Sequence, residues 1–82
     1  MKLNPVQQEI YDLIIADMIK HDRNYSLMTN NEISKHTNIS PFSIRDHVAK
    51  LVKKGVFQRV LNYWNAEKQF FNRVLYKGIK PE

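Results

Sequence analysis

The sequence predicts an α+β domain in which three helices are followed by a two-stranded β-hairpin. Up to Lys54, apolar residues recur every three or four positions, which is the period of an amphipathic helix. After Gly55 the chain becomes rich in β-branched and aromatic residues, which is typical of strands. The polar stretch 65–68 (NAEK) divides this second part in two, so we expect a hairpin with a loop of about four residues.

The first expected helix spans about residues 5–21. Asn4 is a suitable N-cap, and Pro5 stands at the first helical position, where its missing N–H costs nothing. The apolar residues of this segment share one helical face: Val6, Ile10, Leu13, Ile14 and Met18. That stripe predicts a core helix. Residues 25–28 (YSLM), which follow it, have the character of a short strand.

A short second helix is expected over about residues 30–37. Thr29 and Glu32 have the spacing of a capping box, in which the two residues satisfy each other's backbone N–H groups. Ile33 is its main candidate for burial. The helix is expected to end near Asn38, a residue type that tolerates a left-handed backbone.

The third helix is expected over about residues 41–54, with Ser40 as its cap and Pro41 at its first position. Its core stripe consists of Ile44, Val48, Leu51 and Val52. Gly55 is the expected residue after the helix end. The hairpin should then occupy about residues 56–77, and residues 78–82 are expected to be a tail or a linker.

Size and composition restrict the classes of function. The 82 residues are expected to form a single domain, 1–82, which is too small for a deep enclosed active site. The absence of cysteine excludes disulfides, thiol nucleophiles and cysteine-ligated zinc, and favours a reducing compartment. The three histidines lie on different segments and there are only two glycines, so we predict no metal site, no cofactor and no catalytic set.

The chain also lacks the signature of a membrane protein. No apolar run approaches the roughly 18 residues of a membrane span, and the start of the chain has no signal-peptide core. We therefore expect a cytoplasmic protein that is not an enzyme, with no membrane partner and no evident small-molecule substrate.

Charge is distributed unevenly along the chain. Residues 1–30 hold three basic and four acidic side chains, a net of −1, whereas residues 31–82 hold ten basic and four acidic ones, a net of +6. A clustered positive excess favours a polyanionic partner, with nucleic acid ahead of a membrane surface. The basic part contains the third expected helix.

The order of these elements resembles the winged helix-turn-helix fold over about residues 5–77. The sharpest part is residues 27–60 (LMTNNEISKHTNISPFSIRDHVAKLVKKGVFQRV), which is similar to the bacterial regulator pattern L-A-x-x-L-G-I-S followed by V-x-x-x-V-x-x-L-x-x-K-G and I-x-R-V. The residues that match as they stand are Ile39, Ser40, Leu51, Lys54, Gly55 and 58–60 (QRV). MarR-like regulators look like this, and so do the DNA-binding domains of some phage and plasmid replication initiators.

Two departures from that pattern concern single positions. Thr37 stands where an apolar residue is usual, and Asp46 stands where the MarR-like pattern often has arginine. A DNA contact therefore does not carry over at Asp46. MarR-type dimers also pair through extra terminal helices for which this chain has no room, so the resemblance does not imply a family dimer.

The resemblance implies that double-stranded DNA is the partner and that the third helix enters the major groove. The expected DNA-binding residues of this recognition helix are Ser40, Phe42, Ser43, Arg45, Asp46, Lys50, Lys53 and Lys54. At the start of the second helix they are Thr29, Asn30 and Asn31, where backbone amides are available to a phosphate. On the hairpin, the wing of this fold, they are Asn65, Lys68 and Gln69.

Several of these residues have an alternative structural interpretation. Asp46 has the spacing to pair with Lys50 one turn later, and Phe42 can pack against the second helix or the hairpin. Tyr63 and Trp64 either fold back onto the first helix or present their rings to a partner. Lysines near the helix end are either phosphate contacts or a solvated surface.

Two hairpin arginines and the biological role stay open at this level. Arg59 and Arg73, expected nearly opposite each other on the two strands, either approach DNA or line the sheet. The role is transcriptional regulation or origin recognition in a replication initiator, as a monomer or weak homodimer, either alone or as part of a larger protein. The alternative is a protein-interaction module that uses an aromatic wing surface, made of Trp64, Phe70, Phe71 and Tyr76.

Overall fold

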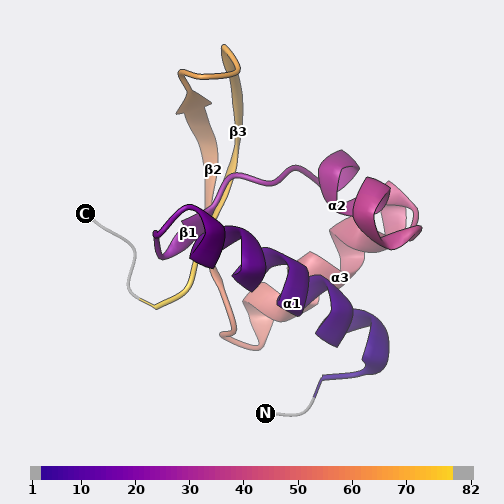
Figure 1. Cartoon of the computed structure of the whole chain (residues 1–82). Coiled ribbons are helices and arrows are strands. Elements are labelled where there is room, and N and C mark those ends of the chain that lie inside the picture. The colour runs from indigo at the N-terminus through magenta and orange to yellow at the C-terminus, as the bar shows by residue number, and fades with distance from the viewer. Residues whose placement is uncertain (1–2, 79–82) are drawn as a thin grey trace.

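The computed structural model describes residues 3–78 and has the α+β arrangement that the sequence predicts (Figure 1). In chain order the elements are α1 (Pro5–Lys20), β1 (Tyr25–Ser26), α2 (Asn30–Thr37), α3 (Pro41–Lys53), β2 (Gln58–Asn65) and β3 (Phe70–Tyr76). The helices gather on one side of the molecule, and the β2–β3 hairpin projects beyond them (Figure 1). No helix in the described part is long and apolar enough to cross a membrane.

Helix α1 begins and ends with identifiable caps. The Asn4 side chain accepts a hydrogen bond from the backbone N–H of Gln7 at 2.8 Å, and Pro5 occupies the first turn. At the other end Asp22 adopts a left-handed backbone with φ 51°, so the chain turns sharply into β1. Val6 is 39% exposed and lies outside the core, contrary to the prediction from periodicity.

Helices α2 and α3 are joined by three residues, Asn38, Ile39 and Ser40. Asn38 has the left-handed conformation that its residue type favours (φ 58°), and this reverses the chain after α2. The hydroxyl of Ser34 donates to the backbone oxygen of Ile39 at 2.5 Å and holds the turn against the helix. Ser40 then caps α3 by accepting from the backbone N–H of Ser43 at 3.3 Å.

The end of α3 explains the position of Gly55. The backbone N–H of Gly55 donates to Val52 and that of Val56 donates to Leu51, each at 3.0 Å. These two bonds form a Schellman motif, which requires a left-handed residue at Gly55, whose φ is 80°. The motif directs the chain away from α3 and into β2.

A single core lies between the helices and the sheet. Its buried residues are Ile10, Ile14, Met18, Met28, Ile33, Ile44, Val48, Leu51, Phe57 and Leu75. Phe57 stacks on Tyr11 of α1, with ring centroids 5.6 Å apart, and so fastens the start of the hairpin to the first helix. Because α3 contributes Ile44, Val48 and Leu51, the position of its opposite face is set by this core.

The sheet has three antiparallel strands in the order β1-β3-β2. Tyr25 and Ser26 of β1 pair with Tyr76 and Leu75 of β3, a pairing that the sequence did not predict. Ser26 of β1 also contacts α1: its side chain is buried and its hydroxyl donates a hydrogen bond to the Asp17 carboxylate at 2.8 Å. Strand β1 thereby ties the base of the hairpin to α1.

The β2–β3 hairpin, called the wing below, closes through residues 66–69. Gln69 has a left-handed backbone (φ 62°), and its N–H donates to the backbone oxygen of Asn65 at 2.8 Å. Between Val60 and Tyr63 the register shifts, with Asn62 at φ 58°. Such a bulge increases the local twist of a strand.

Candidate nucleic-acid interface

The outer face of α3 is a free surface. Its inner stripe is buried, whereas Phe42 is 77% accessible, the highest value among the large apolar side chains of residues 3–78. The other predicted recognition-helix residues are exposed as well: Ser40, Ser43, Arg45, Asp46, Lys50, Lys53 and Lys54. The alternative in which Phe42 packs against α2 or the hairpin is therefore wrong. Its ring lies instead under the Arg45 guanidinium, 5.3 Å from the centroid.

The charged residues of this face are available for a partner. No ion pair joins Asp46 to Lys50 within residues 3–78, so the intrahelical pair that the spacing allowed does not form. Lys50 and Lys53 likewise have no hydrogen-bond or ion-pair partner in that part of the chain. Lys54 differs, because its ammonium donates to the side-chain oxygen of Gln7 at 3.0 Å. It links α3 to α1, which argues against its predicted use as a phosphate contact.

The start of α2 adjoins the start of α3. A surface depression of about 340 Å³ is lined by Thr29, Asn30, Asn31, Pro41, Phe42 and Arg45. Thr29 caps α2 by accepting from the backbone N–H of Glu32 at 3.2 Å, as the capping box predicts. Asn31 is exposed. Residues predicted separately at the two helix starts are thus brought together on one surface.

Asn30 connects this depression to the wing. Its side-chain oxygen accepts a hydrogen bond from the Arg73 guanidinium of β3, which also donates to the backbone oxygen of Met28 at 3.3 Å. Within the described residues no carboxylate lies within ion-pair distance of Arg73. Burial, and after it the positive charge of Arg59, lower the pKa of Arg73 to about 10. The arginine is thus charged at neutral pH and lacks a counterion.

The three predicted wing residues are engaged inside the protein. Asn65 is only 3% exposed, and its side-chain oxygen accepts from the backbone N–H of Lys68 at 3.1 Å. The Lys68 ammonium binds the Glu32 carboxylate at 2.5 Å, and the Gln69 amide donates to the backbone oxygen of Ala66 at 3.1 Å. The prediction that Asn65 faces DNA is wrong, because its side chain is buried. Lys68 and Gln69 are exposed and hold the turn and its contact with α2, and their contact with DNA stays a prediction.

The contact with Lys68 changes the pKa of Glu32. Burial by itself raises the pKa of Glu32, but the hydrogen bond and charge of Lys68, together with hydrogen bonds from Thr29, outweigh burial and hold that pKa below its ordinary value. The carboxylate therefore serves two purposes, because it completes the cap of α2 and anchors the wing turn.

The wing exposes aromatic side chains and the apolar Leu61. Trp64 is 46% accessible and Phe71 is 63% accessible, and their rings meet edge to face with centroids 5.0 Å apart. The alternative in which Trp64 folds back onto α1 is thus wrong. Tyr76 lies apart from this pair, since it packs on Tyr25 at the base of the sheet. Tyr63 and Phe70 are 38% and 39% exposed.

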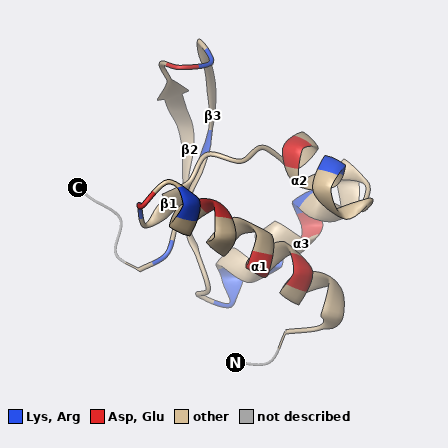
Figure 2. Cartoon of the chain, in the orientation of Figure 1, with Lys and Arg blue, Asp and Glu red and all other residues tan. Residues whose placement is uncertain are grey.

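Charge differs between the two sides of the molecule. In the ribbon of Figure 2, acidic positions are marked red along α1 ahead of the basic Lys20, whereas α3 carries basic positions in blue beside the acidic Asp46. This arrangement follows from the sequence, in which α1 belongs to the part with a net of −1 and α3 to the part with a net of +6. The exposed face of α3 therefore lies on the side suited to a polyanion.

Residues 23–58 match the family model of winged helix-turn-helix DNA-binding domains. The match covers β1, α2, α3 and the first residue of β2, and the structure adds α1 and the wing. The chain contains a winged helix-turn-helix domain. The matched family is described as DNA-binding, which supports DNA as the partner of this domain. No curated protein and no solved structure matches the chain.

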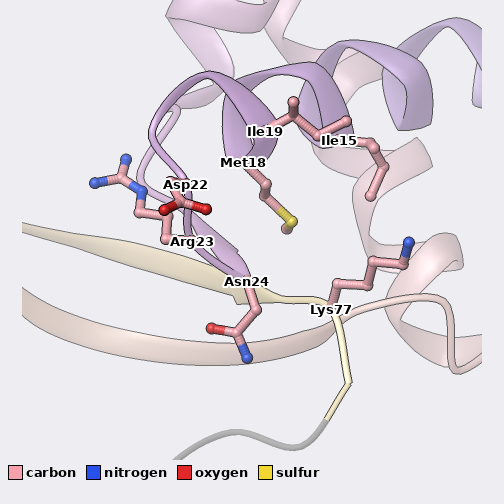
Figure 3. A pocket seen from close by; sticks show the side chains of 7 residues that line it. All are labelled: Ile15, Met18, Ile19, Asp22, Arg23, Asn24 and Lys77. Carbon is pink, nitrogen blue, oxygen red and sulfur yellow. The ribbon is translucent and has the colours of Figure 1, made fainter.

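A further depression, of about 510 Å³, lies away from α3 at the end of α1 (Figure 3). It is lined by Ile15, Met18, Ile19, Asp22, Arg23, Asn24 and Lys77. The Arg23 guanidinium is occupied there, because it donates to the backbone oxygen of Tyr25 at 3.1 Å and lies over the Tyr25 ring. We assign no site to this open surface.

The role of Arg73 at the start of α2 is the main feature that sequence reasoning missed. The chain shows only an arginine within a strand, opposite or near Arg59. In the structure Arg59 pairs with Leu75 rather than facing Arg73 directly. The bulge in β2 shifts the register, and the contact with Asn30 joins positions 43 residues apart. No local pattern signals such a contact.

Proposed function

We propose that this domain recognises specific sequences in duplex DNA by inserting α3 into the major groove. The observation that carries the proposal is the outer face of α3, where Phe42 and Arg45 are exposed and Lys50 and Lys53 have no partner within residues 3–78. The major groove is about 12 Å wide and admits one helix, and its base edges carry the sequence code.

The residues of α3 divide into base readers and phosphate contacts. Arg45 is suited to a guanine edge, Ser43 to several bases, Phe42 to a thymine methyl group and Asp46 to a cytosine amino group. Lys50 and Lys53 are flexible point charges near the end of the helix, which suits them to phosphates. In this proposal the lysines supply affinity and the first turns of α3 supply selectivity.

The start of α2 adds a backbone contact. Its first N–H groups point away from the helix, where Asn31 is exposed and the Arg73 charge lies beside Asn30. A phosphate placed in the depression between α2 and α3 meets both helix starts at once. Such a contact orients the domain on the duplex without reading its sequence.

Two biological roles use this mode of binding. One is transcriptional regulation, in which two copies occupy two half-sites about 34–36 Å apart. The other is origin recognition by one module of a replication initiator, such as those of phages and plasmids. The mass of the protein–DNA complex separates them, since two copies per site favour the regulator and one copy favours the initiator.

An NMR titration tests where DNA binds on this 9.8 kDa chain. On addition of mixed-sequence duplex at low salt, we expect the largest amide shift changes in residues 41–53 and 29–31. The control is the same titration at high salt, where binding must weaken because phosphate contacts release counterions. Shift changes confined to the wing would contradict the proposal, and so would a spectrum that does not change at any salt concentration.

A protein-interaction module is the second candidate, because Trp64 and Phe71 are exposed on the wing. The net charge of +6 over residues 31–82 favours DNA over this candidate. Binding that survives charge reversal at Lys50 and Lys53 but is lost in Trp64→Ala would favour the protein partner.

A further inference from the structure

One face of the wing carries both aromatic rings and arginines. Alternate residues of a strand point to the same side, so Phe71, Arg73 and Leu75 of β3 share a face. Trp64 of β2 is the register partner of Phe71, and Arg59 is the partner of Leu75. Since Leu75 lies in the core, this face begins at the helices, continues through the arginines and ends in the aromatic pair.

The outer end of that face is apolar and neutral. Residues 61–72 contain one acidic and one basic side chain, Glu67 and Lys68, so their net charge is zero. The Lys68 ammonium is already bound to Glu32. A wing that gripped phosphates at its tip would need free cations there, and this one offers the rings of Trp64 and Phe71 instead.

The aromatic face is continuous with the candidate DNA surface. Arg73, two residues from Phe71 on β3, donates a hydrogen bond to Asn30 at the start of α2. Asn30 lines the same depression as Phe42 and Arg45 of α3. DNA that occupies α3 and the start of α2 therefore passes beside the arginines at the base of the wing.

The size of the exposed patch helps to identify its partner. Trp64 and Phe71, which are 46% and 63% exposed, present roughly 200 Å² together, if each complete ring offers about 200 Å². A stable protein interface buries about 800 Å² on each partner, so this patch is too small to hold a second protein alone. Two rings beside two arginines match what unstacked nucleotides require, since bases stack on aromatic rings and phosphates are neutralised by cations.

We propose that Trp64 and Phe71 stack on nucleobases that are opened next to the duplex bound by α3. The proposal rests on the proposed function and deepens it, because it specifies DNA with an unpaired or easily opened step as the preferred substrate. Apolar side chains that enter the base stack are a general way to exploit such steps. The wing then selects DNA by its deformability, and α3 selects it by sequence.

Trp64 is the single tryptophan of the chain, so its fluorescence reports on the wing alone. The experiment compares a fully paired duplex with the same duplex carrying a short central mismatch, next to the sequence that α3 contacts. We expect roughly tenfold tighter binding to the mismatched DNA, as one stacked base provides, with quenching of Trp64 emission.

Two variants and one control define the role of the wing. Phe71→Ala should abolish the preference for mismatched DNA and keep the fluorescent reporter, and Phe71→Leu, which keeps an apolar side chain without a ring, should abolish it as well. The matched control is Ile19→Ala on α1, which also removes an exposed apolar side chain, 74% accessible, and should keep the preference. Thermal melting verifies that each variant is folded.

The outcomes separate the two proposals. Equal affinity for both DNAs with unchanged Trp64 emission would overturn the stacking proposal while duplex binding by α3 stands. Absence of binding to either DNA would overturn both. If Phe71→Ala reduced self-association in sedimentation and left DNA binding unchanged, the patch would be a contact between copies of the chain, and the stacking proposal would again be wrong.

Discussion

The outer face of α3 and the wing are both exposed, yet they offer opposite chemistry. On α3, Arg45, Asp46, Lys50 and Lys53 are exposed, and the two lysines are unpaired within the described residues. On the wing, Asn65, Lys68 and Gln69 form bonds inside the protein, and the rings of Trp64 and Phe71 are left to the solvent. Exposure alone does not therefore reveal what a surface binds, and the internal bonds of each polar group have to be examined as well.

The difference arises from the local structure of the two elements. A helix satisfies its own backbone, so the outward side chains of α3 are free once the inner stripe is buried. A hairpin turn needs additional hydrogen bonds, and here Asn65 and Gln69 supply them. Polar turn residues that the sequence suggests as hydrogen-bonding partners of DNA are therefore also the residues that close the turn.

The largest expected effect is a loss of duplex affinity when charged side chains of α3 are removed. The triple variant Arg45→Ala, Lys50→Ala, Lys53→Ala should lose roughly a thousandfold in duplex affinity near 0.1 M salt, because up to three phosphate or base contacts disappear. Fluorescence anisotropy with a labelled duplex measures the loss.

A matched control removes the same charge from other exposed positions, in Lys20→Ala, Lys35→Ala, Lys77→Ala. We expect that control to lose far less affinity than the α3 variant. Equal losses in the two triple variants would mean that only net charge matters, and the assignment of α3 as the binding helix would fail.

The next prediction distinguishes α3 residues that recognise bases from those that only strengthen binding to any DNA. Arg45→Ala should reduce discrimination between a preferred site and a mismatched site by about 1–3 kcal/mol, the contribution of a good bidentate base contact. Lys53→Ala should weaken binding to both sites alike. Competition titrations with the two sites measure this difference. A uniform loss in Arg45→Ala would show that Arg45 contacts a phosphate.

Substitution of Arg73 tests the contact between the wing and the start of α2. Because its charge is buried without a carboxylate partner, Arg73→Met should change the free energy of unfolding by no more than about 1 kcal/mol. Duplex affinity should fall roughly tenfold, as expected for one lost phosphate contact near 0.1 M salt. Urea unfolding and anisotropy measure the two quantities.

The control for Arg73→Met is Arg59→Met, which removes an exposed arginine from the neighbouring strand β2. It should also leave stability unchanged. A large loss of stability in Arg73→Met together with unaltered DNA affinity would make Arg73 a purely structural residue.

The smallest effect concerns the contact that anchors the wing turn. Since the pKa of Glu32 is lowered in the folded protein, its ionised form contributes stability above the ordinary glutamate pKa of 4.5, and this stability is lost as pH falls below that value. The contribution should be under about 1 kcal/mol, because both partners are partly exposed.

Urea unfolding at pH 7 and near pH 4 compares the wild type with Glu32→Gln. The stability difference between the two proteins should shrink at the lower pH, because Glu32 binds a proton more readily in the unfolded chain, where its pKa is not lowered. A difference that stays constant across this range would show that the ion pair with Lys68 does not stabilise the fold, and that the amide replaces the carboxylate in the helix cap.

Much of the fold was predictable from local signals in the sequence. The cap at Thr29, the left-handed Asn38 and the helix end at Gly55 each depend on residues within one or two turns, and the structure confirms all three. The pairing of β1 with β3 was not predictable, since Ser26 and Leu75 meet only after the chain has folded.

The candidate site likewise has a part that the sequence predicts, on α3, and a part that it does not, on the wing. The exposed face of α3 follows from helical periodicity, because burial of Ile44 and Val48 leaves Arg45 and Asp46 outside. The surroundings of the wing residues could not be predicted, since the burial of Asn65 and the contact of Lys68 with Glu32 depend on how the hairpin is placed relative to α2.

The central claim is that Lys50 and Lys53 of α3 supply electrostatic contacts with duplex DNA and that the exposed rings of the wing, Trp64 and Phe71, do not. The direct test measures the slope of log affinity against log salt for three proteins: the wild type, Lys50→Ala with Lys53→Ala, and Trp64→Ala with Phe71→Ala. We predict that the slope falls by about 1.8 in the lysine variant, as two lost phosphate contacts require, and stays unchanged in the aromatic variant. An unchanged slope in the lysine variant, or an equal fall in both, would contradict the account.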